Sequence, residues 1–367
     1  MPTLELMLIK KKLILKDAID KSFLTEFLPG EVILLNDQIR LSYERKLNGA
    51  NLNNLVEFIP VDQILKPFDI NRDKKCTSVV IRSGGIGDLL ALSTVCEQLP
   101  GRVNFVTQSK YFDVFNWYRN RVNLYDMTKP IFTAFTYRKS MEVANTFRYV
   151  KFEDAVEKGA RENWYHIFYK SIGMDIKPEL CRPILNRSYK IDENIYNGKS
   201  VLLVHRSTAN MRSMSLETMY KAVNNVFPKH NVYVHNAILT AKDAEFAENN
   251  DIFTITANTV AEYLEDVYNV DMVVSVDSAA IHFREGVQKP AIGIYNAFTA
   301  ECRTKYYRTT KSFDISPVCE KQPCFLHQTK IDENCEFAEI GHTEAPCFGK
   351  LNKNIVAELT EKIRSSL

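Results

Sequence analysis

The sequence predicts an α/β protein with two domains, each built on a parallel sheet with helices on its faces. The chain has 367 residues, more than the roughly 250–300 at which single cores stop growing. Apolar residues make up 45% and charged residues 25%, the usual balance of a globular protein. Short β-rich runs alternate with amphipathic helical patterns twice, from about residue 76 and again from about residue 199.

Charge and hydropathy limit the classes of protein that the sequence could represent. The formal net charge is +2, so the overall charge does not favour a nucleic-acid partner, although a local basic groove stays open. The sequence has no run of roughly 18 apolar residues, the length that a helix needs to span a membrane. The segment Met1–Lys12 lacks the long apolar core and the small-residue cleavage site of a signal peptide. We therefore expect a cytoplasmic protein.

Residues 1–75 show no clear repeat, and we interpret them as an N-terminal extension of unknown role. Leu13–Leu15 and Val32–Leu35 could form short strands, and Asn48–Asn54 has the composition of a turn.

The first domain is expected over residues 76–198. A β-rich run at Thr77–Arg82 leads into a glycine loop at Ser83–Gly87. Apolar side chains then recur at spacings of three and four, as on one face of a helix; they are Leu89, Leu92, Val95 and Leu99. Arg102–Thr107 follows as the next strand. This order is typical of the start of a doubly wound parallel sheet.

The second domain is expected over residues 199–350, after a hinge at Asn186–Lys199 that is rich in polar and turn residues. A capping box formed by Thr259 and Glu262 opens one of its helices. A final amphipathic helix is predicted within residues 351–367. The predicted strands are Ser200–His205, Asn231–His235, Ile252–Thr256, Met272–Val276 and Lys289–Tyr295.

The glycine loop is the first candidate site. The carboxyl ends of parallel strands face the ligand crevice, and Gly84, Gly85 and Gly87 would let a ligand or another backbone come close there. Asp88 follows at the helix start, where unpaired N–H groups favour a carboxylate. The pattern is neither a Walker motif nor a dinucleotide fingerprint, and a plain helix cap would explain Asp88 equally well.

A second candidate site is the segment Asp277–His282, which joins a buried strand to a helix. The N–H groups of Ser278, Ala279, Ala280 and the next residue would open that helix and could bind a diphosphate. His282 falls in the first turn of the helix. A capped helix with a satisfied core histidine is the alternative interpretation.

A third candidate site is the loop His205–Arg212, which follows the first strand of the second domain. Arg206 and Arg212 could contact phosphates, and Ser207 and Thr208 could donate hydrogen bonds to them. A solvated loop without a ligand is equally compatible with this composition.

Together these segments resemble glycosyltransferase family 9, the heptosyltransferases of lipopolysaccharide core synthesis. Val80–Leu90 is similar to the opening of that family, and Asp277–Phe283 with Lys289–Tyr295 is similar to its Asp-Thr/Ser-Gly-x-x-His segment and the strand that follows. Cys319–Cys347 looks like the cysteine-containing tail of some members. The resemblance covers about residues 76–367, and Ala279 stands where the family usually has glycine.

The resemblance implies a GT-B fold, in which two Rossmann-like domains face each other across a cleft. It also implies an inverting, metal-independent transfer from a nucleoside diphosphate sugar, without a cofactor. Asp88 matches the position of the general base, on the acceptor side with the glycine loop. Residues 351–367 would pack back on the first domain. The positions implied to bind the donor are Ser207, Thr208, Arg212, Asp277, Ser278, Ala279, Ala280 and His282.

Four of the eight cysteines crowd into the tail, at Cys319, Cys324, Cys335 and Cys347. Four, ten and eleven residues separate them in turn, which is not the spacing of a zinc finger or ribbon. We expect reduced, partly buried thiols. A structural zinc site, with the nearby His327 and His342, is the alternative.

We therefore expect sugar transfer to a hydroxyl acceptor, with Asp88 as base and the second domain holding the leaving diphosphate. The acceptor stays open between a glycan, a glycolipid and a hydroxylated nucleic-acid base. The basic, aromatic stretches Tyr111–Arg121 and Tyr137–Arg148 would suit a nucleic acid or a lipid phosphate. A non-catalytic nucleotide-binding protein is the alternative of another class, and the carboxylate beside the glycine loop disfavours it.

Overall fold

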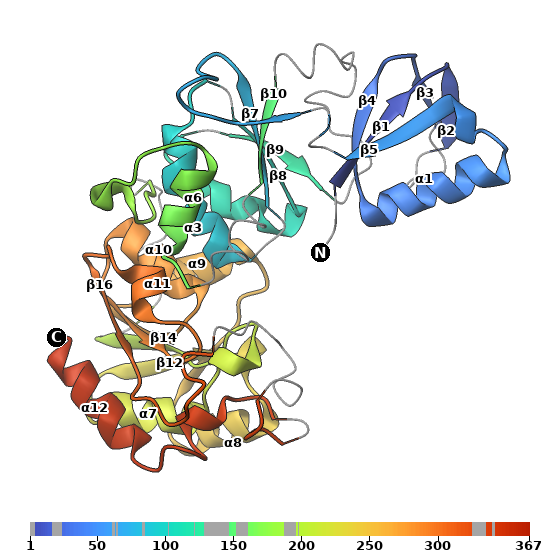
Figure 1. The fold of residues 1–367 in the computed structure, drawn as a ribbon. Helices are drawn as coiled ribbons and strands as arrows, with labels where there is room; N and C mark the ends of the chain where they lie inside the picture. The colour runs from blue at the N-terminus through green and yellow to red at the C-terminus, as the bar shows by residue number, and fades with distance from the viewer. Residues whose placement is uncertain are drawn as a thin grey trace.

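The chain forms a small antiparallel unit followed by two α/β domains with parallel sheets (Figure 1). The computed structural model describes residues 4–16, 24–60, 63, 65–82, 85–101, 103–120, 122–127, 147–151, 161–186, 196, 198–324, 335–339 and 342–367. None of the helices in these ranges has the length and apolar character needed to cross a membrane. The hinge expected over 186–199 lies mostly outside the described residues.

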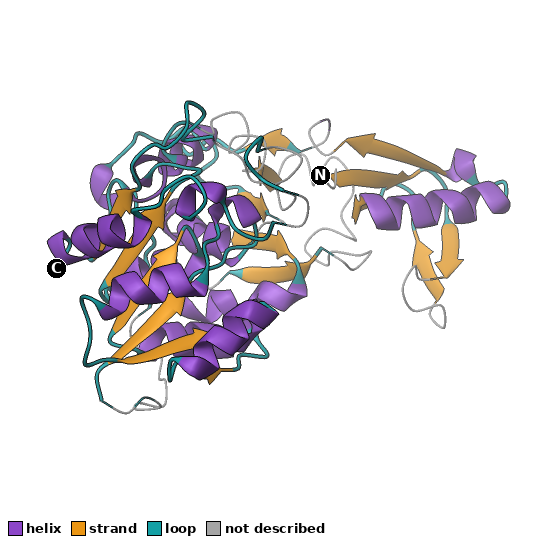
Figure 2. Ribbon diagram, turned by 90° about the horizontal axis from the view of Figure 1, so that it is seen from below, coloured by secondary structure: helices purple, strands orange, loops and turns teal. Residues whose placement is uncertain are grey.

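The N-terminal extension is a folded unit as far as residue 60. Its three-stranded antiparallel sheet has the order β4-β1-β5, beside a β2–β3 hairpin. Met7, Ile33, Tyr43 and Leu47 belong to a separate hydrophobic core. Figure 2 shows the unit set apart from the two α/β domains. Its elements are β1 (Leu4–Ile9), β2 (Leu13–Lys16), β3 (Leu24–Phe27), β4 (Val32–Asn36), α1 (Asp37–Gly49) and β5 (Val56–Pro60).

The first α/β domain has a five-stranded sheet of order β6-β10-β7-β8-β9, with every pairing parallel. The sequence pattern placed the start of this domain at residue 76. The domain begins earlier, because β6 pairs with β10 and Phe68 packs in this core. Its elements are β6 (Lys66–Pro67), β7 (Thr77–Ile81), α3 (Ile86–Gln98), β8 (Val103–Thr107), β9 (Asn123–Asp126), β10 (Phe147–Lys151) and α6 (Trp164–Ser171).

The second α/β domain has a six-stranded parallel sheet of order β13-β12-β11-β14-β15-β16. Numbered within the domain, this is the order 3-2-1-4-5-6 of doubly wound nucleotide-binding folds. Its strands are β11 (Ser200–Val204), β12 (Asn231–His235), β13 (Phe253–Ile255), β14 (Met272–Val276), β15 (Ala291–Tyr295) and β16 (Thr310–Asp314). Its helices are α7 (Leu216–Asn224), α8 (Ala241–Asn249), α9 (Val260–Asn269), α10 (Ala279–Val287) and α11 (Ala300–Thr304).

The two α/β domains share one continuous core where they meet. Trp117 of the first domain packs edge-on against Phe283 of the second, with 4.7 Å between the ring centroids. A Cβ at Gly286 would lie 2.5 Å from Leu185 Cδ1, so only glycine allows this approach of α10 to the first domain. At this contact, the two α/β domains are therefore packed together rather than separated by solvent.

The last helix, α12 (Ile355–Ser365), packs on the second domain, so the expected packing on the first domain is wrong. Its apolar stripe of Ile355, Leu359 and Ile363 lies in the second-domain core. It runs beside α7 (Figure 1), and Thr360 Oγ1 lies 3.5 Å from the carbonyl oxygen of Ala222 on that helix. An amphipathic pattern shows which face of a helix is buried, but not which apolar surface covers it.

Candidate active site

A cavity of about 560 Å³ opens beside the first turns of α3 and α10, and residues of both turns line it. Most of the sequence-predicted residues line it: Gly85, Gly87, Asp88, Ser207, Thr208, Arg212, Asp277, Ser278, Ala279 and His282. Ala280 is buried and does not line the cavity, and Gly84 lies outside the described residues. Three segments far apart in the sequence therefore meet at one place.

The strand order explains why the cavity lies here. β11 and β14 are neighbours, but β12 pairs on the far side of β11 and β15 on the far side of β14. Connections that leave such a pair diverge, and ligands bind in the crevice outside the carboxyl ends of the two strands. The loop 205–212 follows β11, and the segment 277–282 follows β14. The glycine loop follows β7, at the corresponding reversal between β7 and β10.

Asp88 lies in the first turn of α3 and is 25% exposed at its side chain. The cap position is Gly85, and no side chain makes a cap hydrogen bond there, so Asp88 is not the helix cap. Its carboxylate forms an ion pair of 2.9 Å with Arg82, at the end of β7. Burial raises the pKa of Asp88, but the charge and hydrogen bond of Arg82 outweigh burial and lower it. The group is thus an ionised carboxylate at neutral pH.

The two described glycines of the loop have different roles. A Cβ at Gly85 would meet no atom within 4 Å, so space beside the loop stays open to a ligand. A Cβ at Gly87 would lie 3.1 Å from His282 Cδ2 and 3.4 Å from Ala279 Cα. Gly87 therefore lets the first turn of α3 approach the first turn of α10.

The start of α10 has the geometry of an anion-binding helix terminus. Ser278 is the N-cap, and its hydroxyl accepts a hydrogen bond of 3.3 Å from the N–H of Ala280. The remaining N–H groups of the first turn have no partner within the helix. They carry the positive end of the helix dipole, and Ser278 and Ala279 line the cavity.

Beside this helix start, Asp277 binds two arginines. Arg212 Nη1 lies 2.9 Å from the Asp277 carboxylate, and Arg303 Nε lies 3.9 Å from it. Burial opposes ionisation of Asp277, but the two guanidinium groups hold its pKa at about 2. The cluster carries one net positive charge, which suits a diphosphate. Arg303, on α11, also stacks over the ring of Trp164.

Arg206 lines the cavity, but its guanidinium group is held elsewhere. It donates to the Asp243 carboxylate at 3.0 Å and to the Thr343 carbonyl at 2.8 Å. Arg206 donates from Nε, Nη1 and Nη2, whereas Arg212 binds Asp277 through Nη1 and its Nε has no partner among the described residues. The structure therefore favours Arg212 over Arg206 as a phosphate ligand, although both were candidates.

His282 is 3% exposed, and Tyr307 Oη lies 2.7 Å from its Nδ1 atom. Burial lowers the pKa of His282 to about 4, against the opposing charge of Asp277. The imidazole is therefore neutral at neutral pH.

Sequence reasoning gave no role in this site to Arg82, although it lies in the Val80–Leu90 segment. Tyr111 was noted only within a basic, aromatic stretch. The other residues that it missed belong to no motif: Trp164, His235, Tyr263, Arg303 and Tyr307.

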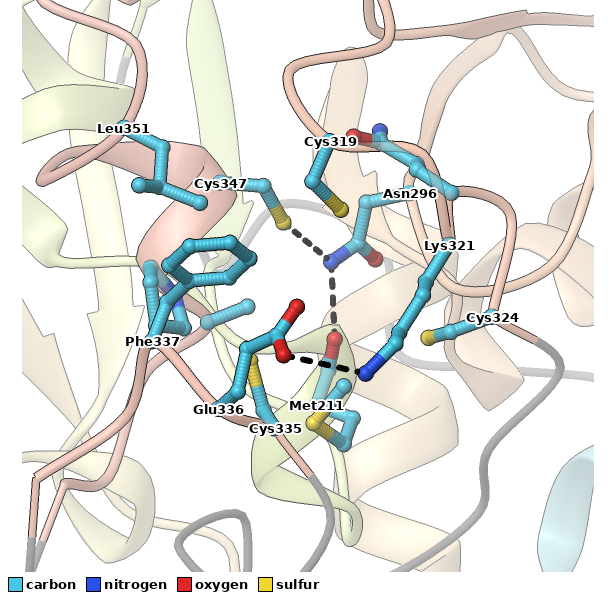
Figure 3. A pocket seen from close by; sticks show the side chains of 13 residues that line it. Met211, Asn296, Cys319, Lys321, Cys324, Cys335, Glu336, Phe337, Cys347 and Leu351 are labelled. Atoms are coloured by element: carbon cyan, nitrogen blue, oxygen red, sulfur yellow. Dashed lines mark hydrogen bonds and ion pairs between the residues drawn. The ribbon is translucent and has the colours of Figure 1, made fainter.

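The four tail cysteines line a second, smaller cavity of about 60 Å³ (Figure 3). Asn296 joins this cavity to the donor loop, because its Nδ2 lies 3.2 Å from Cys347 Sγ and 2.7 Å from the Met211 carbonyl. Met211 lies beside Arg212. Burial raises the pKa of Cys347 to about 11. In the described ranges, no group of three His, Cys, Asp or Glu side chains lies close enough to hold a metal ion.

No family model matches the sequence, and no curated protein matches it. Among solved structures, the chain is similar to the iron-containing dodecameric glycosyltransferase TibC from enterotoxigenic E. coli H10407, with 11% identity and a TM-score of 0.55. The match covers 100% of this chain and 92% of TibC. The complex of TibC, a dodecameric iron-containing heptosyltransferase, with ADP-D-β-D-heptose gives 9% identity, a TM-score of 0.54, and coverage of 99% and 92%.

At such low identity, the similarity establishes the fold alone. The chain has the predicted GT-B fold of two Rossmann-like domains.

Proposed function

We propose that this chain is an inverting glycosyltransferase of family 9 that moves a sugar from a nucleoside diphosphate sugar to a hydroxyl acceptor. One observation carries the proposal: the ionised carboxylate of Asp88, from the first domain, lines the same cavity as the anion site of the second domain. A protein that only binds nucleotide has no use for a carboxylate beside the anion site. The GT-B fold shared with TibC supports the same conclusion.

The reaction is a direct displacement at the anomeric carbon. Asp88 takes the proton of the acceptor hydroxyl, and the acceptor oxygen attacks the anomeric carbon. The bond from that carbon to the diphosphate oxygen breaks, and its electron pair leaves with the diphosphate. Because the acceptor oxygen attacks on the face opposite the leaving diphosphate, this single displacement inverts the anomeric configuration.

The leaving diphosphate gains negative charge as the bond breaks. The N–H groups at the start of α10, together with Arg212 and Arg303, are the fixed donors and cations for that charge. Such preorganised groups are each worth about 3 kcal/mol in the barrier. We therefore propose that transfer needs neither a divalent metal nor a cofactor.

For the donor, the TibC complex with ADP-D-β-D-heptose supports a nucleoside diphosphate heptose. The acceptor is proposed only as a hydroxyl group. Tyr111 of the first basic, aromatic stretch lines the cavity, whereas residues 137–146 of the second lie outside the described residues.

The test is a panel of nucleotide sugars incubated with the protein, with release of the diphosphate followed by mass spectrometry. Slow hydrolysis of one donor, abolished in Asp88→Asn, is the expected result. Isothermal titration with the matching diphosphate runs in parallel. Tight binding of the diphosphate without consumption of any donor, even with glycan, glycolipid and hydroxymethylated DNA acceptors, would establish a nucleotide-binding protein instead.

We also propose that Cys319, Cys324, Cys335 and Cys347 bind one iron or zinc ion with a structural role. The cysteines share one cavity, and thiolates are favoured ligands for both metals. The amide of Asn296 at Cys347 is an outer partner of the kind that orients metal ligands. The iron in TibC supports the proposal. Metal binding requires the thiols to draw together, since no three lie within ligating reach in the described ranges.

Elemental analysis of the purified chain tests this proposal. Iron or zinc should be present in the wild type and in Cys76→Ser, the control outside the cavity. The metal should be lost from Cys324→Ser and Cys347→Ser. Wild-type protein without either metal, after growth with both, would refute the proposal.

A further inference from the structure

A chain of three polar groups crosses from the first domain to His282. The hydroxyls of Tyr165, on α6, and Tyr307, beyond α11, lie 2.9 Å apart. The Tyr307 hydroxyl lies 2.7 Å from His282 Nδ1. Tyr165 is fully buried, His282 is 3% exposed and Tyr307 is partly buried, so both end groups are shielded from bulk water. This series of hydrogen-bonded groups ends at the cavity, which His282 lines.

Each group in this chain has one proton to place. Burial raises the pKa of both tyrosines well above their usual range and lowers that of His282, so all three are neutral near pH 7. A neutral imidazole is protonated on one nitrogen only and accepts on the other. The direction of the hydrogen bonds therefore decides which atom of His282 donates.

The ring orientation shows what the choice of nitrogen controls. Cδ2, the ring carbon bonded to Nε2, lies 3.1 Å from the Cβ position of Gly87. The Nε2 side of the ring thus lies beside Gly87, at the first turns of α3 and α10, where Gly87, Ala279 and His282 all line the cavity. A protonated Nε2 would donate a hydrogen bond there, whereas an unprotonated one would present a lone pair to an anionic ligand.

We propose that Tyr165 and Tyr307 are positioning residues that fix His282 as a hydrogen-bond donor at the diphosphate site. The opposite direction of hydrogen bonding would leave the hydroxyl proton of the fully buried Tyr165 without an acceptor among the described residues, since Tyr165 would then accept from Tyr307. Tyr165 therefore donates to Tyr307, Tyr307 donates to Nδ1, and the imidazole proton stays on Nε2. Because Tyr165 belongs to the first domain, the donor site is complete only when α6 is docked on the second domain. The assignment of a diphosphate as the ligand rests on the proposed function.

A neighbouring pair provides a matched control. Tyr306 Oη lies 2.7 Å from Nε2 of His166 on α6, so this pair joins the same two segments. Neither residue lines the cavity. Tyr306→Phe therefore removes one hydroxyl from the domain junction and leaves His282 untouched, while Tyr307→Phe removes one from the proposed chain.

The first test is nitrogen NMR of the full chain with ¹⁵N-labelled histidine and no ligand, His282 being assigned from the His282→Asn spectrum. We expect wild-type His282 to be protonated on Nε2 only. Tyr307→Phe should give a mixture of both tautomers, and Tyr306→Phe should leave the His282 signals unchanged. A wild-type proton on Nδ1, or a Tyr307→Phe spectrum identical to wild type at His282, would overturn the proposal.

The second test is calorimetric titration with ADP, GDP and UDP. For the diphosphate that binds, loss of one oriented hydrogen bond should weaken affinity about tenfold in Tyr307→Phe and less in Tyr165→Phe. Tyr306→Phe should bind as wild type; an equal loss there would mean that the hydroxyls only hold the domains together. If none of the three nucleotides binds the wild type, the proposed function fails, and the NMR test still decides the tautomer.

Discussion

Replacing Asp88 with asparagine tests the proposed base most directly. Asparagine keeps the size of the side chain and can still accept a hydrogen bond from Arg82, but it cannot take a proton. Proton transfer by a positioned base is worth about 100–10,000-fold in rate, or about 3–5 kcal/mol in the barrier. We expect Asp88→Asn to lose turnover by that factor and to bind nucleoside diphosphate as the wild type does.

The structure also sets the expected effect on stability. The ion pair with Arg82 is partly exposed, because the side chain of Asp88 is 25% exposed and that of Arg82 is 11% exposed. Losing this ion pair should therefore cost about 1 kcal/mol of stability. With an unfolding entropy of about 2.1 cal/mol/K per residue, a loss of that order lowers the melting temperature of a cooperatively unfolding chain of 367 residues by roughly 1 °C. Glu97→Gln is the matched control, because Glu97 lies near the other end of α3 and also faces an arginine, Arg119, at 4.0 Å.

The assay is release of the diphosphate under donor saturation, with melting temperature and diphosphate affinity measured on the same samples. A rate of diphosphate release in Asp88→Asn close to that of the wild type would refute the role of Asp88 as base. Unfolding of Asp88→Asn, with Glu97→Gln stable, would make Asp88 structural.

The pH profile of turnover depends on the same ion pair. Arg82 lowers the pKa of Asp88, so the base stays ionised, and turnover should persist, below the usual pKa of an aspartate, about 3.9. Arg82→Gln raises the pKa of Asp88, and its acidic limb should move to higher pH. An unchanged limb would show that another group takes the proton.

Three further predictions concern the donor site, the metal and the domain junction. Arg212→Ala should weaken diphosphate binding at least tenfold, since its charge faces the leaving group; unchanged affinity would remove Arg212 from the phosphate site. Brief treatment with EDTA should leave transfer intact, and complete loss restored by manganese would contradict us. Gly286→Ala should lower stability by about 1–3 kcal/mol in a thermal melt, because its Cβ would lie 2.5 Å from Leu185 Cδ1. The double variant Gly286→Ala/Leu185→Ala should lose less stability than the sum of the losses in the two single variants. Losses that add in full would show that the two residues are not in contact.

Local sequence patterns were enough to predict most of the fold. Short buried runs such as Ser200–Val204 and the helix cap at Thr259 depend on neighbours only a few positions away. The strands predicted within residues 200–295 were therefore correct to within one or two residues. Asp88 and Asp277 could be placed at the ligand crevice because each follows a buried strand of a parallel sheet.

The partners of these residues were decided by the tertiary structure. Tyr165 and Tyr307 lie 142 positions apart, and no periodicity connects them. Arg303 reaches Asp277 only because β14 and β15 pair and α11 follows β15. For the same reason, the amphipathic pattern of α12 predicted a buried face but not the helix that covers it. A sequence pattern reports burial and backbone preference, whereas the pKa of Asp88 and the ring orientation of His282 arise from charges and hydrogen bonds that close packing brings together.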